Sequence, residues 1–247
     1  MTRRDAAAAG AVVALGAVVL AGLAGLPAPG DARSAMAALI ASTAVQARHA
    51  TDVVATVTFD YRGFDTIGEE LMLLAASVGV ELLLRPLRDE ALKLRRAARI
   101  VAPSPSAATR WSARQAGVLA LVLGVALAAH GHVSPGGGFQ AGVALGAATL
   151  CVYLASHLPG LRAVVPDHHA AIAEGAGAAA FVLLGGVSVA TGGAYLENVL
   201  PLGTPGRLLS AGTIPVANLA VALAVGGSFA TVLKEFVEQA VGEGRGG

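Results

Sequence analysis

Residues 130–146 read HGHVSPGGGFQAGVALG, a tight turn that leads directly into an apolar helix. Pro135 does not fit a helix interior, and the three glycines that follow it readily adopt turn conformations that other residues avoid. Within the helix, Gly138, Gly142 and Gly146 recur every four residues and therefore share one face. Such a face predicts a groove in which a second helix approaches closely, as it does in membrane helix pairs.

The composition around this turn indicates a membrane protein. Of the 247 residues, 55% are hydrophobic and only 13% are charged, whereas a soluble domain carries about 25% charged residues. The 17 Lys and Arg residues nearly balance the 16 Asp and Glu residues, which argues against a nucleic-acid-binding surface. We therefore expect an all-α integral membrane protein with about six transmembrane helices and short loops, located in the plasma membrane.

Six apolar segments are predicted to cross the ~30 Å hydrocarbon layer. They cover residues 6–26, 67–84, 115–129, 139–155, 170–191 and 213–233. A cleaved signal peptide is the alternative for the first segment, although its apolar region exceeds the roughly 7 to 15 residues typical of such peptides. A re-entrant half-helix is an alternative for the short apolar piece 53–59, and a polar connection is expected at 157–169.

Positive charges concentrate between the second and third segments, where eight Lys and Arg residues lie within residues 85–114. The positive-inside rule places this loop, and with it both termini, in the cytoplasm. Binding of the loop to anionic lipid or to a partner protein is an alternative explanation, but topology alone accounts for the charges.

Acidic residues interrupt the second apolar segment. Glu70, Ser77 and Glu81 fall on one helical face, which should look into protein or water because a carboxylate facing lipid is costly. Two explanations stay open for each acid. Glu70, with its neighbour Glu69, and Glu174 in the fifth segment either handle ions or are acids favoured near a helix start. Glu81 either relays protons or pairs with Arg85, four residues later.

Histidine and cysteine offer weaker signals. His130 and His132 flank the glycine turn and titrate near neutral pH, so proton handling competes with a turn or packing role. No carboxylate or cysteine accompanies them locally, and we expect no metal site. Cys151 is the chain's one cysteine and lies in an apolar run, where we expect it to act as a small packing residue.

Three motifs resemble a known family. GHVSPGGGFQAGV at 131–143, AEGAGA at 173–178 and AGTIPVANLAVALAVGGSFA at 211–230 are similar to the B subunit of Mrp-type multisubunit Na⁺/H⁺ antiporters, the MnhB family. TFDYRGFDTIGEE at 58–70 further resembles a segment at the end of the large A subunit of these systems. The resemblance divides the chain into an N-terminal helix and loop (1–50), an A-subunit-like segment with the basic loop (51–109) and an MnhB-like four-helix domain (110–247).

The resemblance implies a small subunit of a Na⁺/H⁺ antiporter, without a catalytic site or cofactor of its own. Its implied partners are the other subunits of an Mrp-type complex, including large subunits similar to those of respiratory complex I, together with membrane lipids and the transported Na⁺ and H⁺. No nucleic-acid partner is expected. The ion-path candidates are Asp60, Asp65, Glu69, Glu70, Glu81, Glu174, His130 and His132. The helix-packing motif consists of Pro135, Gly136, Gly137, Gly138, Phe139, Gly142 and Gly146. Glu174 and Asn218 match later positions of the family's pattern.

Two other functions remain open from the sequence. The fused front segment also fits a subunit of a membrane-bound hydrogenase or another complex I-like machine. A purely structural scaffold, whose glycine face docks larger subunits, is the third hypothesis. A transporter acting alone is least favoured because no internal repeat is visible.

Overall fold

A computed structural model describes residues 3–25, 35–84, 105–166 and 168–243. The described helices are α1 (Arg3–Ala24), α2 (Ala35–Arg48), α3 (Val53–Thr56), the π-helix η1 (Val57–Tyr61), α4 (Gly63–Leu84), α6 (Ala107–His130), α7 (Gly138–Val164), α8 (His169–Ala190) and α9 (Ile214–Glu243). Pairing between strands within this part of the chain is limited to one isolated bridge, Gly203 with Ser210. The predicted all-α class is confirmed.

The chain forms two compact units, Met1–Ser42 and Thr43–Gly247. The first unit contains α1 and the beginning of α2. The second unit contains the end of α2 and all the later helices. The predicted basic loop lies largely outside the described residues, as does Arg85, the expected partner of Glu81.

Four helices of the second unit are long and apolar enough to cross a membrane: α6, α7, α8 and the part Ile214–Gln239 of α9. Helix α4 has the same length as α8, 22 residues, but acidic side chains interrupt its apolar sequence. The first unit adds a shorter apolar helix, Val12–Ala24. These helices agree with a multi-pass membrane protein of about six spans.

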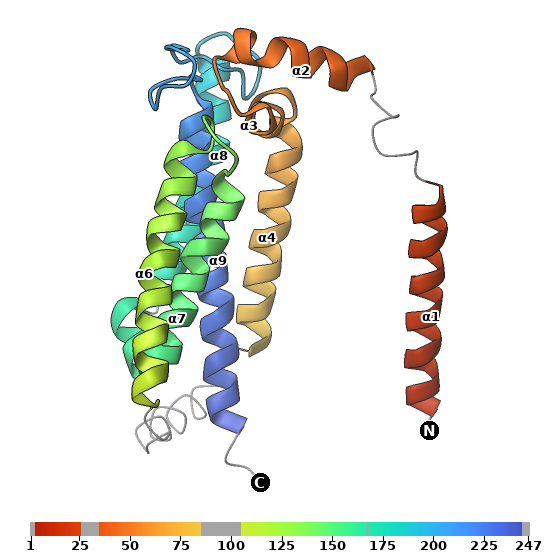
Figure 1. Cartoon of the computed structure of the whole chain (residues 1–247), viewed down its shortest axis with the longest axis vertical. Helices are drawn as coiled ribbons and strands as arrows, with labels where there is room; N and C mark the ends of the chain where they lie inside the picture. Colours follow the sequence, from red (N-terminus) through yellow and green to blue (C-terminus); the bar gives the residue numbers. More distant parts are fainter. Residues whose placement is uncertain (1–2, 26–34, 85–104, 167, 244–247) are drawn as a thin grey trace. The chain divides into compact units, whose positions relative to one another are not determined.

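Helix α9 is the centre of the second unit. Within its apolar stretch 67% of the residues are buried, compared with 17% in α6 and 28% in α7 and α8. It contacts α4, α6, α7 and α8. Helices α4, α7 and α9 run in one direction, and α6 and α8 run in the other (Figure 1). The polar side chains in the middle of α9, Asn218 and Ser228, are both buried inside the protein.

The glycine face of α7 packs directly on α9. A Cβ atom added to Gly142 would lie 2.4 Å from Cβ of Val225, and one added to Gly146 would lie 2.5 Å from Cβ of Phe229. Two helices approach this closely only where a side chain is missing. The second helix predicted on this face is thus α9 of the same chain, and not a helix of a larger subunit as the scaffold hypothesis supposed.

Several helix boundaries differ from the predicted ones. Helix α6 begins at Ala107 and not near 115, and α9 extends to Glu243 and not only to 233. Helix α4 begins at Gly63, so Glu70 lies two turns inside it rather than at its start. Helix α7 continues to Val164 across a break at His157, where φ is 56° and ψ is −166°. Pro159 follows this break in the first turn of a new helical piece, a position that tolerates proline. The predicted polar connection at 157–169 is therefore largely helical.

Candidate functional site

A buried carboxylate lies where α4, α8 and α9 meet. The Glu174 side chain on α8 belongs to a residue that is only 4% exposed. Its Oε2 accepts a hydrogen bond of 3.0 Å from Ser77 Oγ on α4, and its Oε1 accepts one of 2.8 Å from Ser228 Oγ on α9. Three helices thus supply one carboxylate and two hydroxyls, all of them buried.

Glycines bring the backbones of α8 and α9 together around this carboxylate. A Cβ atom on Gly227 would lie 2.4 Å from the backbone nitrogen of Glu174, and one on Gly177 would lie 2.4 Å from that of Ala224. Neither position has room for a side chain. This close approach allows the short side chain of Ser228, next to Gly227, to reach Glu174 across the helix pair.

Helix α4 carries two more carboxylates on the same side as Ser77. Glu70 precedes Ser77 by seven residues, and Glu81 follows it by four. At a rise of ~1.5 Å per residue, these positions lie ~10 Å and ~6 Å from Ser77 along the helix. Both carboxylates lie within electrostatic range of Glu174. The predicted face of α4 therefore becomes a row of acids, with Glu174 between its two ends.

Glu70 differs from Glu174 in how its oxygens are satisfied. The residue is only 5% exposed, and its Oε1 is buried without a hydrogen-bond partner among the described residues. A buried polar atom usually has a partner, because leaving it unpaired costs roughly 1–3 kcal/mol. Glu81 is half-buried, and Glu69 is exposed.

Two acids near the start of α4, Asp60 before it and Asp65 in its first turn, lie in ion pairs outside this row. Asp60 in η1 pairs with Arg48 at the end of α2. Asp65 pairs with Arg62 three residues earlier, and both side chains are more than half exposed, at 52% and 70%. These pairs occupy the carboxylates locally. The predicted roles of Asp60, Asp65 and Glu69 in an ion path stay predictions.

The two histidines of the glycine turn have different environments. His130 is exposed, and its Nδ1 lies 3.0 Å from the Ala126 carbonyl oxygen. His132 is completely buried, with Nε2 3.1 Å from the Leu208 carbonyl oxygen. Burial of the imidazole lowers the pKa of His132 below its ordinary value. His132 therefore joins the turn to the loop before α9 as a neutral group.

The structure adds residues that we did not predict as site residues. Ser77 was placed on the acidic face of α4, but its bond to Glu174 was not foreseen, and Ser228 was missed altogether. A serine inside the apolar run 219–230 is the only signal the sequence offers for it. Asn218, which matched the family's pattern, accepts a 2.8 Å hydrogen bond from the Gly138 backbone N–H and so fixes the start of α7.

The described part of the chain contains no cluster of three or more His, Cys, Asp or Glu side chains that could hold a metal ion. The site offers carboxylate and hydroxyl oxygens instead. Such oxygens suit protons and hard cations, which prefer oxygen ligands.

A family model described as a domain related to the MnhB subunit of Na⁺/H⁺ antiporter matches residues 108–231, about half of the chain. The chain belongs to this family. The match includes α6, α7 and α8 and the Asn218 and Ser228 positions of α9. The MnhB family is thus a family of transporter subunits, and Glu174 lies inside its matched region, whereas the row of acids on α4 lies before it.

Related proteins extend the likeness beyond the family domain. An uncharacterized protein of the archaeon Methanocaldococcus jannaschii is 29% identical over 195 residues, which cover 70% of this chain and 71% of that protein. Among solved structures, a chain of the membrane-bound sulfane sulfur reductase (MBS), an archaeal respiratory membrane complex, has a TM-score of 0.70 at 24% identity, with 96% of this chain and 99% of that chain covered.

The second similar structure is a chain of the Mrp complex from Dietzia sp. DQ12-45-1b. Its TM-score is 0.71 at 23% identity, and 95% of this chain covers only 26% of that chain. At this level of identity the two structures establish a shared fold. The fold includes the helices outside the family match, because nearly the whole chain is covered in both comparisons.

Proposed function

We propose that this chain, a membrane subunit of a multisubunit Na⁺/H⁺ antiporter, contributes a cation- and proton-handling site centred on Glu174. The observation that carries the proposal is the buried Glu174 carboxylate with its hydroxyl partners on two other helices. Glu174 lies in the second turn of α8, yet it is buried among three helices and not exposed at the helix start. Ionisable residues inside membrane helices are costly and mark functional sites by default, which favours a functional role over a structural one.

The exchange can be described by the chemistry of one carboxylate. Glu174 is neutralised either by a proton or by a hard cation such as Na⁺, for which Ser77 and Ser228 supply additional oxygen ligands. Because one binding event excludes the other, release of Na⁺ on one side is coupled to proton uptake. The hydroxyls hold the empty carboxylate between the two events.

The row of acids on α4 extends this site into a path along which ions or protons could cross part of the membrane. Glu70 lies toward the start of α4 and Glu81 toward its end, on either side of Ser77. With Glu174 between them, the steps of ~10 Å and ~6 Å along α4 cover about half of the ~30 Å hydrocarbon thickness. Glu70, with its unpartnered oxygen, is the acid best placed to receive an ion or water from a neighbouring subunit.

The partners are proposed from the relatives. Both similar structures come from multisubunit membrane complexes, and the resemblance to Mrp systems implies large complex I-like subunits beside this chain. The exposed apolar side of α4, with Phe64 at 75% and Leu83 at 86% exposure, provides surface for lipid or for such a partner.

The orientation is part of the proposal. Placing the basic segment between α4 and α6 in the cytoplasm puts both termini there as well. Glu70 then lies in the outer half of the membrane and Glu81 in the inner half. A phosphatase fused to the C-terminus should be inactive, and an active fusion would reverse the direction of the route.

The test of the site is Glu174→Gln in the assembled complex, in vesicles from cells that lack other antiporters. Na⁺-driven proton movement should fall more than about tenfold, because the amide carries no charge to exchange. Glu197→Gln is the matched control, since it makes the same change at an exposed acid in the loop before α9. If the Glu174→Gln complex assembles normally and exchanges Na⁺ and H⁺ at the normal rate, the proposed site is wrong and the scaffold hypothesis is favoured.

A respiratory complex is the second candidate, because the chain covers 99% of the MBS chain but only 26% of the Mrp chain. The two candidates differ in what drives transport. An antiporter exchanges Na⁺ against an imposed pH gradient with no electron donor. If the purified complex moves Na⁺ only when a donor is oxidised, the respiratory assignment is the correct one.

A further inference from the structure

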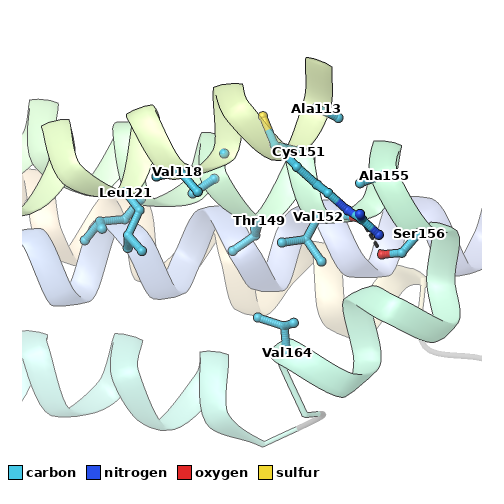
Figure 2. Close-up of a pocket in the computed structure, with 13 residues that line it drawn as sticks. Ala113, Val118, Leu121, Thr149, Cys151, Val152, Ala155, Ser156 and Val164 are labelled. Atoms are coloured by element: carbon cyan, nitrogen blue, oxygen red, sulfur yellow. Dashed lines mark hydrogen bonds between the residues drawn. The ribbon is translucent and has the colours of Figure 1, made fainter. Parts of the chain in front are cut away.

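A groove of about 690 Å³ lies between α6 and α7, away from the acidic site. Small side chains make it hollow: Ala113 and Gly117 from α6, and Cys151 and Ala155 from α7. Val164, after the break in α7, points into it from the opposite side (Figure 2). Side chains of helices in contact normally fill such a space, so we expect an apolar groove of this size in a membrane protein to hold a bound molecule.

The polar groups of the groove are already used, with one exception. Thr149 Oγ1 donates to the Gly146 carbonyl at 2.6 Å, and Ser156 Oγ donates to the Val152 carbonyl at 2.7 Å. Arg114 is the one charged residue in the lining. It is exposed and forms no ion pair with a residue that the structure describes. The groove therefore combines an apolar body with one cation.

The start of α6 also has features of the headgroup region. Trp111, one turn before Arg114, is 65% exposed, and tryptophan concentrates at membrane interfaces. Arg110 lies in the same turn, where its Nη1 donates to the Pro105 carbonyl at 2.8 Å. Arg114 thus follows an exposed tryptophan by one turn, and the apolar groove extends from it along α6 as far as Leu121.

We propose that this groove binds one anionic phospholipid, with an acyl chain between α6 and α7 and the phosphate on Arg114. Charge complementarity favours a lipid over an apolar helix of a partner, because a helix would cover Arg114 without neutralising it. In the proposed orientation this end of α6 faces the cytoplasmic leaflet, where anionic lipids concentrate.

The chain carries its own reporter, because Cys151 lines the groove and is the one cysteine in the sequence. The experiment measures the rate at which N-ethylmaleimide alkylates Cys151 in the delipidated full chain, titrated with either phosphatidylglycerol or phosphatidylcholine. Native mass spectrometry counts the lipid retained. Phosphatidylglycerol should protect Cys151 saturably and should be retained at one molecule per chain, while phosphatidylcholine should protect weakly.

Two variants separate the headgroup from the acyl chain. Arg114→Gln should weaken protection by phosphatidylglycerol about fivefold, which corresponds to ~1 kcal/mol for one basic residue near an anionic surface. Arg62→Gln, a cation at the other end of the bundle, is the matched control and should behave as wild type. Ala148 of α7 also lines the groove, so Ala148→Phe should fill it and abolish retention of both lipids.

Equal protection by the two lipids, or equal behaviour of Arg114→Gln and Arg62→Gln, would overturn the proposal. A different result points to the other occupant. If Cys151 is protected in the assembled complex after complete delipidation, a partner helix fills the groove and no lipid site exists there.

Discussion

The two sides of α9 are built in the same way but hold different chemistry. Toward α7, glycines of α7 allow contact with Val225 and Phe229, and the seam is apolar apart from the Asn218 hydrogen bond at the start of α7. Toward α8, Gly177 and Gly227 allow an equally close approach, but this seam encloses the Glu174 carboxylate. Close glycine packing is therefore a general device in this bundle. What distinguishes the candidate site is the buried ionisable group, and the glycines serve to bring its partners within reach.

Breaking the apolar seam should have the largest effect. In Gly142→Leu, even the Cβ atom would lie 2.4 Å from Cβ of Val225, so α7 and α9 must separate. Overpacking costs typically 1–3 kcal/mol and occasionally more, and a leucine at a helix contact should reach at least the upper end, about 3 kcal/mol. The yield of folded chain and its thermal midpoint in detergent should both fall strongly.

Gly186→Leu on α8 is the control for this prediction, because a Cβ atom there meets nothing within 4 Å. It should express and melt like the wild type. Equal loss in both variants would mean that leucine harms any position of these helices, and that the seam has no special role.

On the polar side, Ser228→Ala should weaken function while leaving the fold intact. The change removes one of the two hydroxyl donors of Glu174 and one proposed cation ligand. With one proposed oxygen ligand missing, the apparent affinity for Na⁺ should fall about tenfold, which corresponds to ~1.4 kcal/mol. The measurement is the Na⁺ concentration giving half-maximal exchange in vesicles.

Ser156→Ala is the matched change on the other side of α9, since its hydroxyl bonds only to its own helix. Exchange by this variant should equal that of the wild type. A similar loss in both serine variants would show that the hydroxyl of Ser228 acts on general stability and not on the cation.

The smallest effect is expected at the ends of the helices, where the seams meet the loops. Burial lowers the pKa of His132, so the folded loop favours the neutral imidazole. In the unfolded loop the imidazole has its ordinary pKa of about 6.5. The stabilising contribution is therefore present above about pH 6.5 and is lost as the pH falls below it. After correction for the intrinsic rate, hydrogen exchange of the amides at 203–211 should be faster at pH 5.5 than at pH 7.5.

His132→Gln removes the titration but keeps a donor for the Leu208 carbonyl. In this variant the ratio of exchange rates at the two pH values should approach that of an unrelated helix, after correction for intrinsic exchange. An unchanged pH dependence would assign the effect to another group.

Much of the fold followed from the sequence because apolar length and charge placement are local properties. The segments that became α6, α7, α8 and α9 could be predicted from their run of apolar residues alone. The start of α4 could not, because Gly63 and Asp65 resemble a loop until the helix is seen to continue through them. The break at His157 was also hidden, since a proline marks either a helix end or the first turn of a new helix.

The candidate site likewise has one part that the sequence predicts and one part that depends on the packing of the helices. The sequence by itself determined that Glu70, Ser77 and Glu81 share a face and that the glycines of α7 share another, since both follow from helical periodicity. Only the tertiary structure decided that the first face meets Glu174 and that the second meets α9 of the same chain. Periodicity fixes directions around one helix axis. Which helix lies in that direction depends on how all the helices pack together, and one sequence does not record this.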